Sequence, residues 1–163
     1  ILNKKAGYVT AVEDSRDATV MDLLPEWVIR KDLAPVGRLD KDTEGLLLFT
    51  NDGKLNHKLL APKSHVDKTY YVEIEKNISD EDILKLEQGL DIGGYVTQPA
   101  KVEKIEDKKI NLTISEGKFH QVKKMLEAVD NKVLFLKRIS FGKLKLNDLA
   151  LGEVREIELK DII

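Results

Sequence analysis

The sequence has no cysteine, no long apolar run and no excess of either charge. Without cysteine, the chain forms neither a disulfide framework nor a thiolate metal site, which suits a reducing cytoplasm. No apolar stretch approaches the roughly 20 residues that a membrane-spanning helix needs. The first residues also lack the pattern of a secretory signal. We therefore expect a cytoplasmic protein without a membrane partner.

The near balance of charge conceals a local asymmetry. The formal net charge of −2 argues against a general nucleic-acid binder, which is usually strongly basic. Between Lys118 and Lys145, however, eight basic residues stand against two acidic ones, whereas seven acids face two lysines between Glu73 and Asp91. This distribution predicts a basic patch on one region. Ordinary solvated faces give the same pattern, and charge alone favours that simpler interpretation.

The length and the hydrophobic pattern predict one α+β domain over residues 1–163. A chain of 163 residues with 42% hydrophobic content builds one core, or two small lobes around a cleft. Alternating apolar residues predict strands, and cap signals predict helices between them. We expect a mostly antiparallel sheet with helices packed on it. The expected strands cover 46–50, 68–75, 110–114, 132–141 and 152–159, and the expected helices follow Thr19, Asp52, Ser79 and Gly117.

The helix expected after Gly117 carries an apolar stripe and two lysines. At about 100° per residue, Lys123 lies beside the stripe, whereas Lys124 points to solvent. Lys123 can therefore reach toward a buried partner. The residues of the stripe, which should face the core, are Phe119, Val122, Leu126 and Val129.

Neither a metal site nor a cofactor site is predicted. The three histidines, His57, His65 and His120, are not spaced as metal ligands on one element. Gly93-Gly94 belongs to neither a phosphate-binding loop nor a dinucleotide-binding motif. The sequence thus offers no basis for cofactor-dependent chemistry.

The stretch GRLDKDTEGLLLFTNDG, residues 37–53, sets charged residues directly before an apolar run. In an extended segment, Arg38 and Asp40 project to the same side, and the apolar strand would hold them rigidly. A partly desolvated carboxylate beside a cation is a plausible nucleophile or acid/base. The residues alone do not choose among Asp40, Asp42 and Glu44. A simple Asx-type turn is the commoner explanation for such an aspartate.

Three stretches resemble the motifs of the pseudouridine synthases. They are GRLDKDTEGLLLFTNDG, then KTYYV at 68–72, then ISEGKFHQVKKML at 114–126. They occur in the family's order and span nearly the whole chain. The combination of LAPKSHVDKTY with SEGKFHQVKKM is most similar to the branch that modifies small-subunit ribosomal RNA. The resemblance implies the pseudouridine synthase catalytic fold.

The resemblance also implies a reaction and the residues that carry it. The bond between ribose and uracil N1 is broken and re-formed through uracil C5, without a metal or cofactor. The extruded target base stacks on an aromatic side chain. The implied catalytic residues are Asp40 as the catalytic carboxylate, Tyr70 as the stacking aromatic and Lys123 as the cation that pairs with Asp40. The implied RNA-binding residues are Arg38, Lys118, His120 and Lys124.

The implied substrate is 16S ribosomal RNA or a small-subunit assembly intermediate, bound by a monomer. Two alternatives remain: a large-subunit ribosomal RNA synthase, and a non-catalytic RNA-binding protein of ribosome assembly. The family usually has Asn-Lys-Pro near the start of the catalytic domain, where this chain has Lys5 in place of proline. Members of the branch usually carry an N-terminal RNA-binding domain, which this chain lacks. We expect either a fragment or an enzyme that works without that module.

Overall fold

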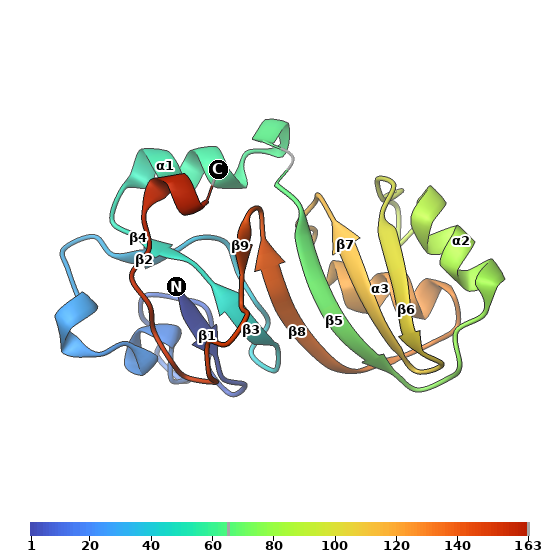
Figure 1. The fold of residues 1–163 in the computed structure, drawn as a ribbon, viewed down its shortest axis with the longest axis horizontal. Coiled ribbons are helices and arrows are strands. Elements are labelled where there is room, and N and C mark those ends of the chain that lie inside the picture. The colour runs from blue at the N-terminus through green and yellow to red at the C-terminus, as the bar shows by residue number, and fades with distance from the viewer. Residues whose placement is uncertain (65, 163) are drawn as a thin grey trace. The chain divides into compact units, whose positions relative to one another are not determined.

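A computed structural model describes residues 1–64 and 66–162, and the chain divides into two units (Figure 1). Unit 1 consists of Ile1–Val66 and Arg138–Ile163, and unit 2 of Asp67–Lys137. Strand β8 (Val133–Phe141) contributes its first residues to unit 2 and its last to unit 1. The prediction of an α+β fold with a mostly antiparallel sheet is confirmed.

Unit 1 is built on a short sheet whose strand order is β1, β3, β8, with β9 paired to the end of β8. A separate two-stranded ladder joins β2 to β4. Val36, Leu46, Phe141 and the neighbouring apolar residues form its core cluster. The strands and the α-helix are β1 (Leu2–Lys4), β2 (Ala34–Pro35), β3 (Glu44–Leu47), β4 (Phe49–Thr50), β9 (Leu144–Lys145) and α1 (Gly53–Leu60); the 3-10 turns cover Val20–Leu23, Glu26–Val28, Pro62–Ser64 and Leu159–Asp161.

Unit 2 continues from β8 through β5 and β7 to β6, with α2 beside β6 and α3 behind the strands (Figure 1). Strand β5 pairs antiparallel with β7, so that Tyr70 lies opposite Leu112. In both strands, every second side chain is buried, as the alternating sequence predicts. The elements are β5 (Lys68–Ile74), β6 (Lys101–Glu106), β7 (Lys109–Ile114), α2 (Asp80–Gln88) and α3 (Gln121–Ala128).

Most predicted elements are confirmed with small shifts at their ends. Asp52 caps α1 by accepting hydrogen bonds from two backbone N–H groups, and Ser79 caps α2 in the same way with one. These side chains satisfy donors that the first helical turn leaves unpaired. The helix expected after Thr19 is a single 3-10 turn, which Thr19 caps.

Two predicted strands are wrong in detail. The strand predicted over 46–50 is interrupted at Leu48, whose carbonyl accepts a hydrogen bond from the Val36 N–H. The chain changes partner there, from β1 to β2. The strand predicted over 152–159 is reduced to one bridge between Leu2 and Val154. Because β1 has only three residues, it is too short to form a longer ladder with this segment.

Strand β3 passes unusually close to β8 at Gly45. This glycine has φ +115, and a Cβ placed on it would lie 2.2 Å from the Arg138 carbonyl oxygen. The Arg138 side chain is itself buried and donates from Nε to the Leu46 carbonyl at 2.9 Å. Only glycine combines this backbone angle with this approach.

We predict that Gly45→Ala destabilises the protein by about 3 kcal/mol or more, because a strained φ is added to a clash with backbone. Gly7→Ala is the matched control, since Gly7 also has a positive φ but a Cβ added to it would meet no atom within 4 Å. That control should lose only about 1–2 kcal/mol. Urea unfolding of both variants measures the difference, and equal losses would contradict the close approach.

Candidate active site

The charged stretch before β3 is organised around the buried ammonium group of Lys4. The Lys4 side chain is fully buried. Its Nζ donates to the carbonyl oxygens of Asp40 at 3.2 Å, Lys41 at 3.1 Å and Thr43 at 2.7 Å, and to that of Lys5 at 3.1 Å. One cation thus holds the main chain directly at Asp40 and just beyond it.

Further hydrogen bonds hold the residues on either side of Asp40. The Thr10 hydroxyl donates to the Leu39 carbonyl and accepts from the Leu39 N–H. The N–H of Gly7 donates to the Lys41 carbonyl at 2.8 Å. The backbone around Asp40 is therefore fixed by groups distant in the sequence.

The side chains of this loop differ in exposure. Asp40 is half-buried, whereas Arg38 and Asp42 are exposed. Burial lowers the pKa of Lys4 to about 8, against the opposing charges of Asp42, Glu44 and Asp40. The acids thus offset part of the cost of burying a cation. Sequence reasoning missed Lys4, because a lysine in a three-residue strand carries no periodic signal.

In unit 2, Tyr70 lies on the inward face of β5. Its side chain is 9% exposed and shares the buried face with Val72 and Ile74. The predicted orientation of this strand is confirmed. Its neighbour Tyr71 lies on the other face and donates to Glu73 Oε2 at 2.7 Å.

The loop before α3 is held by a polar network that sequence reasoning also missed. The buried Gln121 accepts from the Lys118 N–H at 3.1 Å and donates to Glu116 at 3.0 Å. Glu116 accepts in addition from the Tyr95 hydroxyl and from the Gln98 N–H. The GKFH segment is thereby fixed from both of its ends. Both residues that build this network, Glu116 and Gln121, stand in the third motif of the sequence. An analysis of apolar periodicity does not reveal them.

One residue of the predicted stripe is not in the core. Phe119 is 73% exposed, whereas Val122, Leu126 and Val129 are buried as predicted. Helix α3 begins only at Gln121, and His120 has a left-handed φ of 51°, so helical periodicity does not extend back to Phe119. The Phe119 ring instead stacks on His120, with the ring centroids 3.8 Å apart.

Two lysines near this pair contact aromatic rings. The Nζ of Lys124 lies 5.2 Å from the centre of the Phe119 ring. The Lys124 side chain is half-buried and is therefore less exposed than predicted. The Nζ of Lys118 lies 4.3 Å from the centre of the Tyr95 ring. Lys123, one residue before Lys124 on α3, is half-buried, as expected beside the stripe.

The predicted site residues are divided between the two units. Unit 1 carries Arg38 and Asp40, on the loop that Lys4 holds. Unit 2 carries the others: Tyr70, Lys118, His120, Lys123 and Lys124. Within unit 2, the last four lie on α3 and on the loop directly before it.

Residues 1–64 and 66–162 contain no group of three or more His, Cys, Asp or Glu side chains that would hold a metal ion. His65, one of the three histidines considered for metal binding, lies outside the described residues. In the same part of the chain, no helix is long and apolar enough to cross a membrane.

Comparison with known proteins identifies the family of the chain. Residues 1–128 match the family model described as RNA pseudouridylate synthase. An RNA pseudouridine synthase of Bacillus subtilis, whose name marks it as uncharacterized, is 53% identical over 99% of this chain and 70% of its own length. The ribosomal small subunit pseudouridine synthase A of Yersinia pestis is 42% identical, and that of Escherichia coli 41% identical. Each match covers 99% of this chain, with 70% and 71% of the respective relative.

The solved structures lead to the same class. A crystal structure titled pseudouridylate synthase superimposes with a TM-score of 0.90 at 36% identity, over 98% of this chain and 70% of that one. The human RNA pseudouridylate synthase domain containing 4, at 17% identity and a TM-score of 0.53, shares the fold over 97% of this chain and 69% of its own. The α+β fold and these matches define an RNA-modifying isomerase. This chain belongs to the RNA pseudouridylate synthase family.

We predict that Lys4→Met lowers the free energy of unfolding by about 2 kcal/mol or more, because it leaves buried carbonyl oxygens without a donor. The same substitution should reduce turnover, since the hydrogen bonds from Lys4 to those carbonyls fix the backbone at Asp40. Urea unfolding measures the first effect. Lys5→Met is the control, because the Lys5 side chain is exposed.

The difference in the free energy of unfolding between the parent and Lys4→Met should depend on pH, and this dependence tests the charge state of Lys4. Its pKa of about 8 in the folded protein lies below the value of about 10.4 of an unperturbed lysine. Between these values the unfolded chain binds more protons, so the Lys4 contribution to the free energy of unfolding rises with pH. The stability advantage of the parent over Lys4→Met should therefore increase from pH 8 to pH 10. A constant difference over that range would contradict a lowered pKa.

Proposed function

We propose that this protein converts one uridine of small-subunit ribosomal RNA to pseudouridine, with Asp40 as the catalytic carboxylate. The observation that carries the proposal is the Arg-Leu-Asp loop, whose backbone is held at Asp40 by the buried Lys4. Its support comes from relatives named as ribosomal small subunit pseudouridine synthase A, which match 99% of this chain. On this proposal, residues 1–163 form the catalytic domain.

In the proposed reaction, the bond between the ribose anomeric carbon and uracil N1 breaks and a bond to C5 forms. The C5 proton is released, and N1 gains a proton, so the reaction needs neither an oxidant nor a metal. The ionised Asp40 carboxylate acts as the nucleophile that makes this cleavage possible. Arg38, two residues earlier on the same loop, helps to hold the extruded nucleotide.

We assign three roles to the site residues of unit 2: stacking on the target base, supplying a positive charge for the carboxylate, and binding the RNA backbone. Tyr70 stacks on the flipped base, since aromatic stacking is worth about 1–3 kcal/mol per base. Lys123 supplies the positive charge that favours an ionised carboxylate. Lys118, His120 and Lys124 contact phosphates. The stack of the exposed Phe119 on the half-buried His120, near these lysines, supports this assignment, because aromatic rings next to cations are typical of single-stranded RNA sites.

The proposal includes a monomeric enzyme of the cytoplasm that acts on 16S ribosomal RNA, either free or within a small-subunit assembly intermediate. The basic residues from Lys118 to Lys145 would follow the RNA backbone. Binding should accordingly weaken as the salt concentration rises.

Tritium release from 5-tritiated uridine in unmodified 16S ribosomal RNA tests the reaction, both on the free transcript and on partly assembled small subunits. The parent should release tritium and Asp40→Asn should not, since the amide is neither charged nor nucleophilic. Asp42→Asn is the matched control on the same loop and should retain activity, because the exposed Asp42 is assigned no chemistry.

Other outcomes of this experiment discriminate between the alternatives. Release by Asp40→Asn but not by Asp42→Asn would transfer the catalytic role to Asp42. Release from 23S instead of 16S ribosomal RNA would identify a large-subunit enzyme. RNA binding without any release from either RNA would favour a non-catalytic assembly protein.

Adjacent lysines on α3 provide a second prediction. Lys123→Met should slow single-turnover conversion by about a hundredfold, the scale expected for loss of one charge-stabilising group, with little change in RNA affinity. Lys124→Met should instead weaken RNA binding and reduce the salt dependence by about one ion, with single-turnover conversion preserved. Near-normal conversion by Lys123→Met would remove this lysine from the mechanism.

A further inference from the structure

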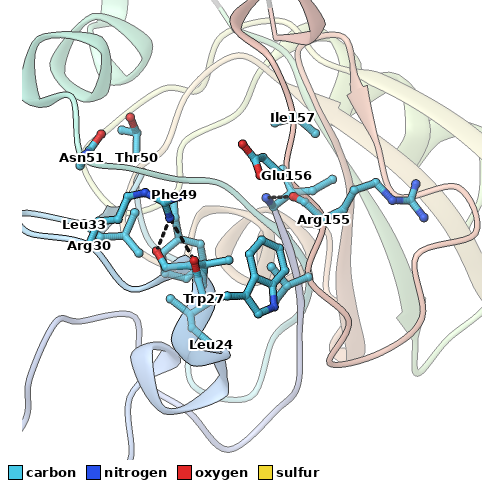
Figure 2. A pocket seen from close by; sticks show the side chains of 13 residues that line it. Leu24, Trp27, Arg30, Leu33, Phe49, Thr50, Asn51, Arg155, Glu156 and Ile157 are labelled. Atoms are coloured by element: carbon cyan, nitrogen blue, oxygen red, sulfur yellow. Dashed lines mark hydrogen bonds between the residues drawn. The ribbon is translucent and has the colours of Figure 1, made fainter.

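Unit 1 contains an open pocket of about 250 Å³ around Trp27, the only tryptophan of the chain (Figure 2). The Trp27 side chain is 58% exposed, which is unusual for so large an apolar group. A second hollow adjoins the same ring near Pro25 and Val154. None of the residues assigned to catalysis or RNA binding above lines either hollow.

Local structure holds Trp27 in this exposed position. The ring belongs to the 3-10 turn Glu26–Val28, which follows Pro25. Nη1 of Arg30 donates to the carbonyl oxygens of Trp27 and Val28, each at 3.2 Å (Figure 2). The turn is therefore closed by a guanidinium group, and Arg30 lines the same pocket as Trp27.

The lining of the pocket is apolar on one part and polar on another. Leu24, Leu33 and Phe49 supply the apolar part. Arg30, Asn51 and Arg155 supply donors, and Asn51 and the Glu156 carboxylate supply acceptors. The Arg155 guanidinium is 3.5 Å from Asp148 and 3.6 Å from Glu153, so acidic neighbours share its charge. Arg30 thus places a positive charge in the pocket that the Trp27 ring also lines.

We propose that this pocket binds one unpaired nucleobase of RNA, stacked on Trp27, with Arg30 directed to an adjacent phosphate. An exposed aromatic face with a nearby arginine is the arrangement by which proteins bind single-stranded nucleic acid. The pocket is smaller than the roughly 300–1,000 Å³ typical of sites for drug-sized ligands, which suits one planar ring. The inference rests on the proposed function, in which RNA is the substrate.

An apolar peptide is the other class of ligand that would use the Trp27 ring. Its backbone and side chains would have no need of the Arg30 charge. RNA uses both features, because each nucleotide has a ring that stacks and a phosphate that carries negative charge. The pocket therefore favours RNA.

Trp27 reports on its own occupancy through its fluorescence. Titration with hexauridylate, an unstructured RNA, should quench this emission in a saturable way, because a base stacks on the indole. A hexamer of abasic ribose phosphates is the matched probe, and it should leave the emission unchanged. Equal quenching by both probes, or no quenching by hexauridylate at any concentration, would overturn the proposal.

Variants test the energetic role of the ring. Trp27→Ala should weaken hexauridylate binding about tenfold, as measured by the anisotropy of a fluorescein-labelled oligonucleotide, and Trp27→Phe should recover most of the affinity. Ile29→Ala is the control, since Ile29 is 48% exposed two residues away and does not line the pocket. Thermal unfolding establishes that each variant is folded. Unchanged affinity in a folded Trp27→Ala protein would contradict base binding.

The tritium assay separates this inference from the proposed function. In that assay, Trp27→Ala should raise KM about tenfold and leave kcat unchanged, since the pocket binds RNA without touching the reacting atoms. Quenching by hexauridylate without tritium release by the parent would retain the pocket and reject the proposed function. Tritium release without quenching would reject the pocket alone.

Discussion

The fold of the Arg-Leu-Asp loop depends on one buried cation. Lys4 donates to three carbonyl oxygens of the loop, including that of Asp40, and it does so from a fully buried position. Burying an ammonium group is costly, and its lowered pKa reflects that cost. The charges of Asp42, Glu44 and Asp40 act in the opposite direction. The acidic character of this stretch thus has a structural cause, because these carboxylates help to keep Lys4 charged.

The third motif is also held by polar side chains, which here are neutral or acidic groups. Gln121 is buried and binds both the Lys118 N–H and Glu116, which in turn holds Tyr95 and the Gln98 N–H. In each unit, buried polar side chains fix the backbone, and the exposed side chains, such as Arg38 and Phe119, are left to meet solvent or ligand. Satisfied polar networks are rigid because an unpaired member in low dielectric is costly.

Sequence patterns predicted the features that follow a local or repeating rule. They missed the features that depend on individual contacts in the folded chain. The alternation in β5 and β7 and the caps Asp52 and Ser79 were recognisable, since each follows a local rule. Phe119 was misplaced because the left-handed His120 separates it from the helix, and no periodicity reveals where a helix begins. Lys4 was missed because its acceptors lie 36 to 39 residues away, a relation that only the folded chain creates. The membership of the Arg-Leu-Asp loop in a known motif came from resemblance, whereas the reason for its rigidity came from the structure.

The Trp27 pocket and the loop of Asp40 share a supporting element in unit 1. The ladder of β2 and β4 places Phe49 and Thr50 in the wall of the pocket, and Leu33, which directly precedes β2, completes that wall. The same strand β2 leads through Val36, bonded to the Leu48 carbonyl, into the segment that carries Asp40. A base bound at Trp27 would therefore contact the β2–β4 ladder, from which the chain leads into the segment with Asp40. Binding energy from parts of a substrate that do not react is most useful where it orients the part that does. A contact at Trp27 would orient the RNA when it binds, which lowers KM, and because it does not touch the reacting atoms it would leave kcat unchanged.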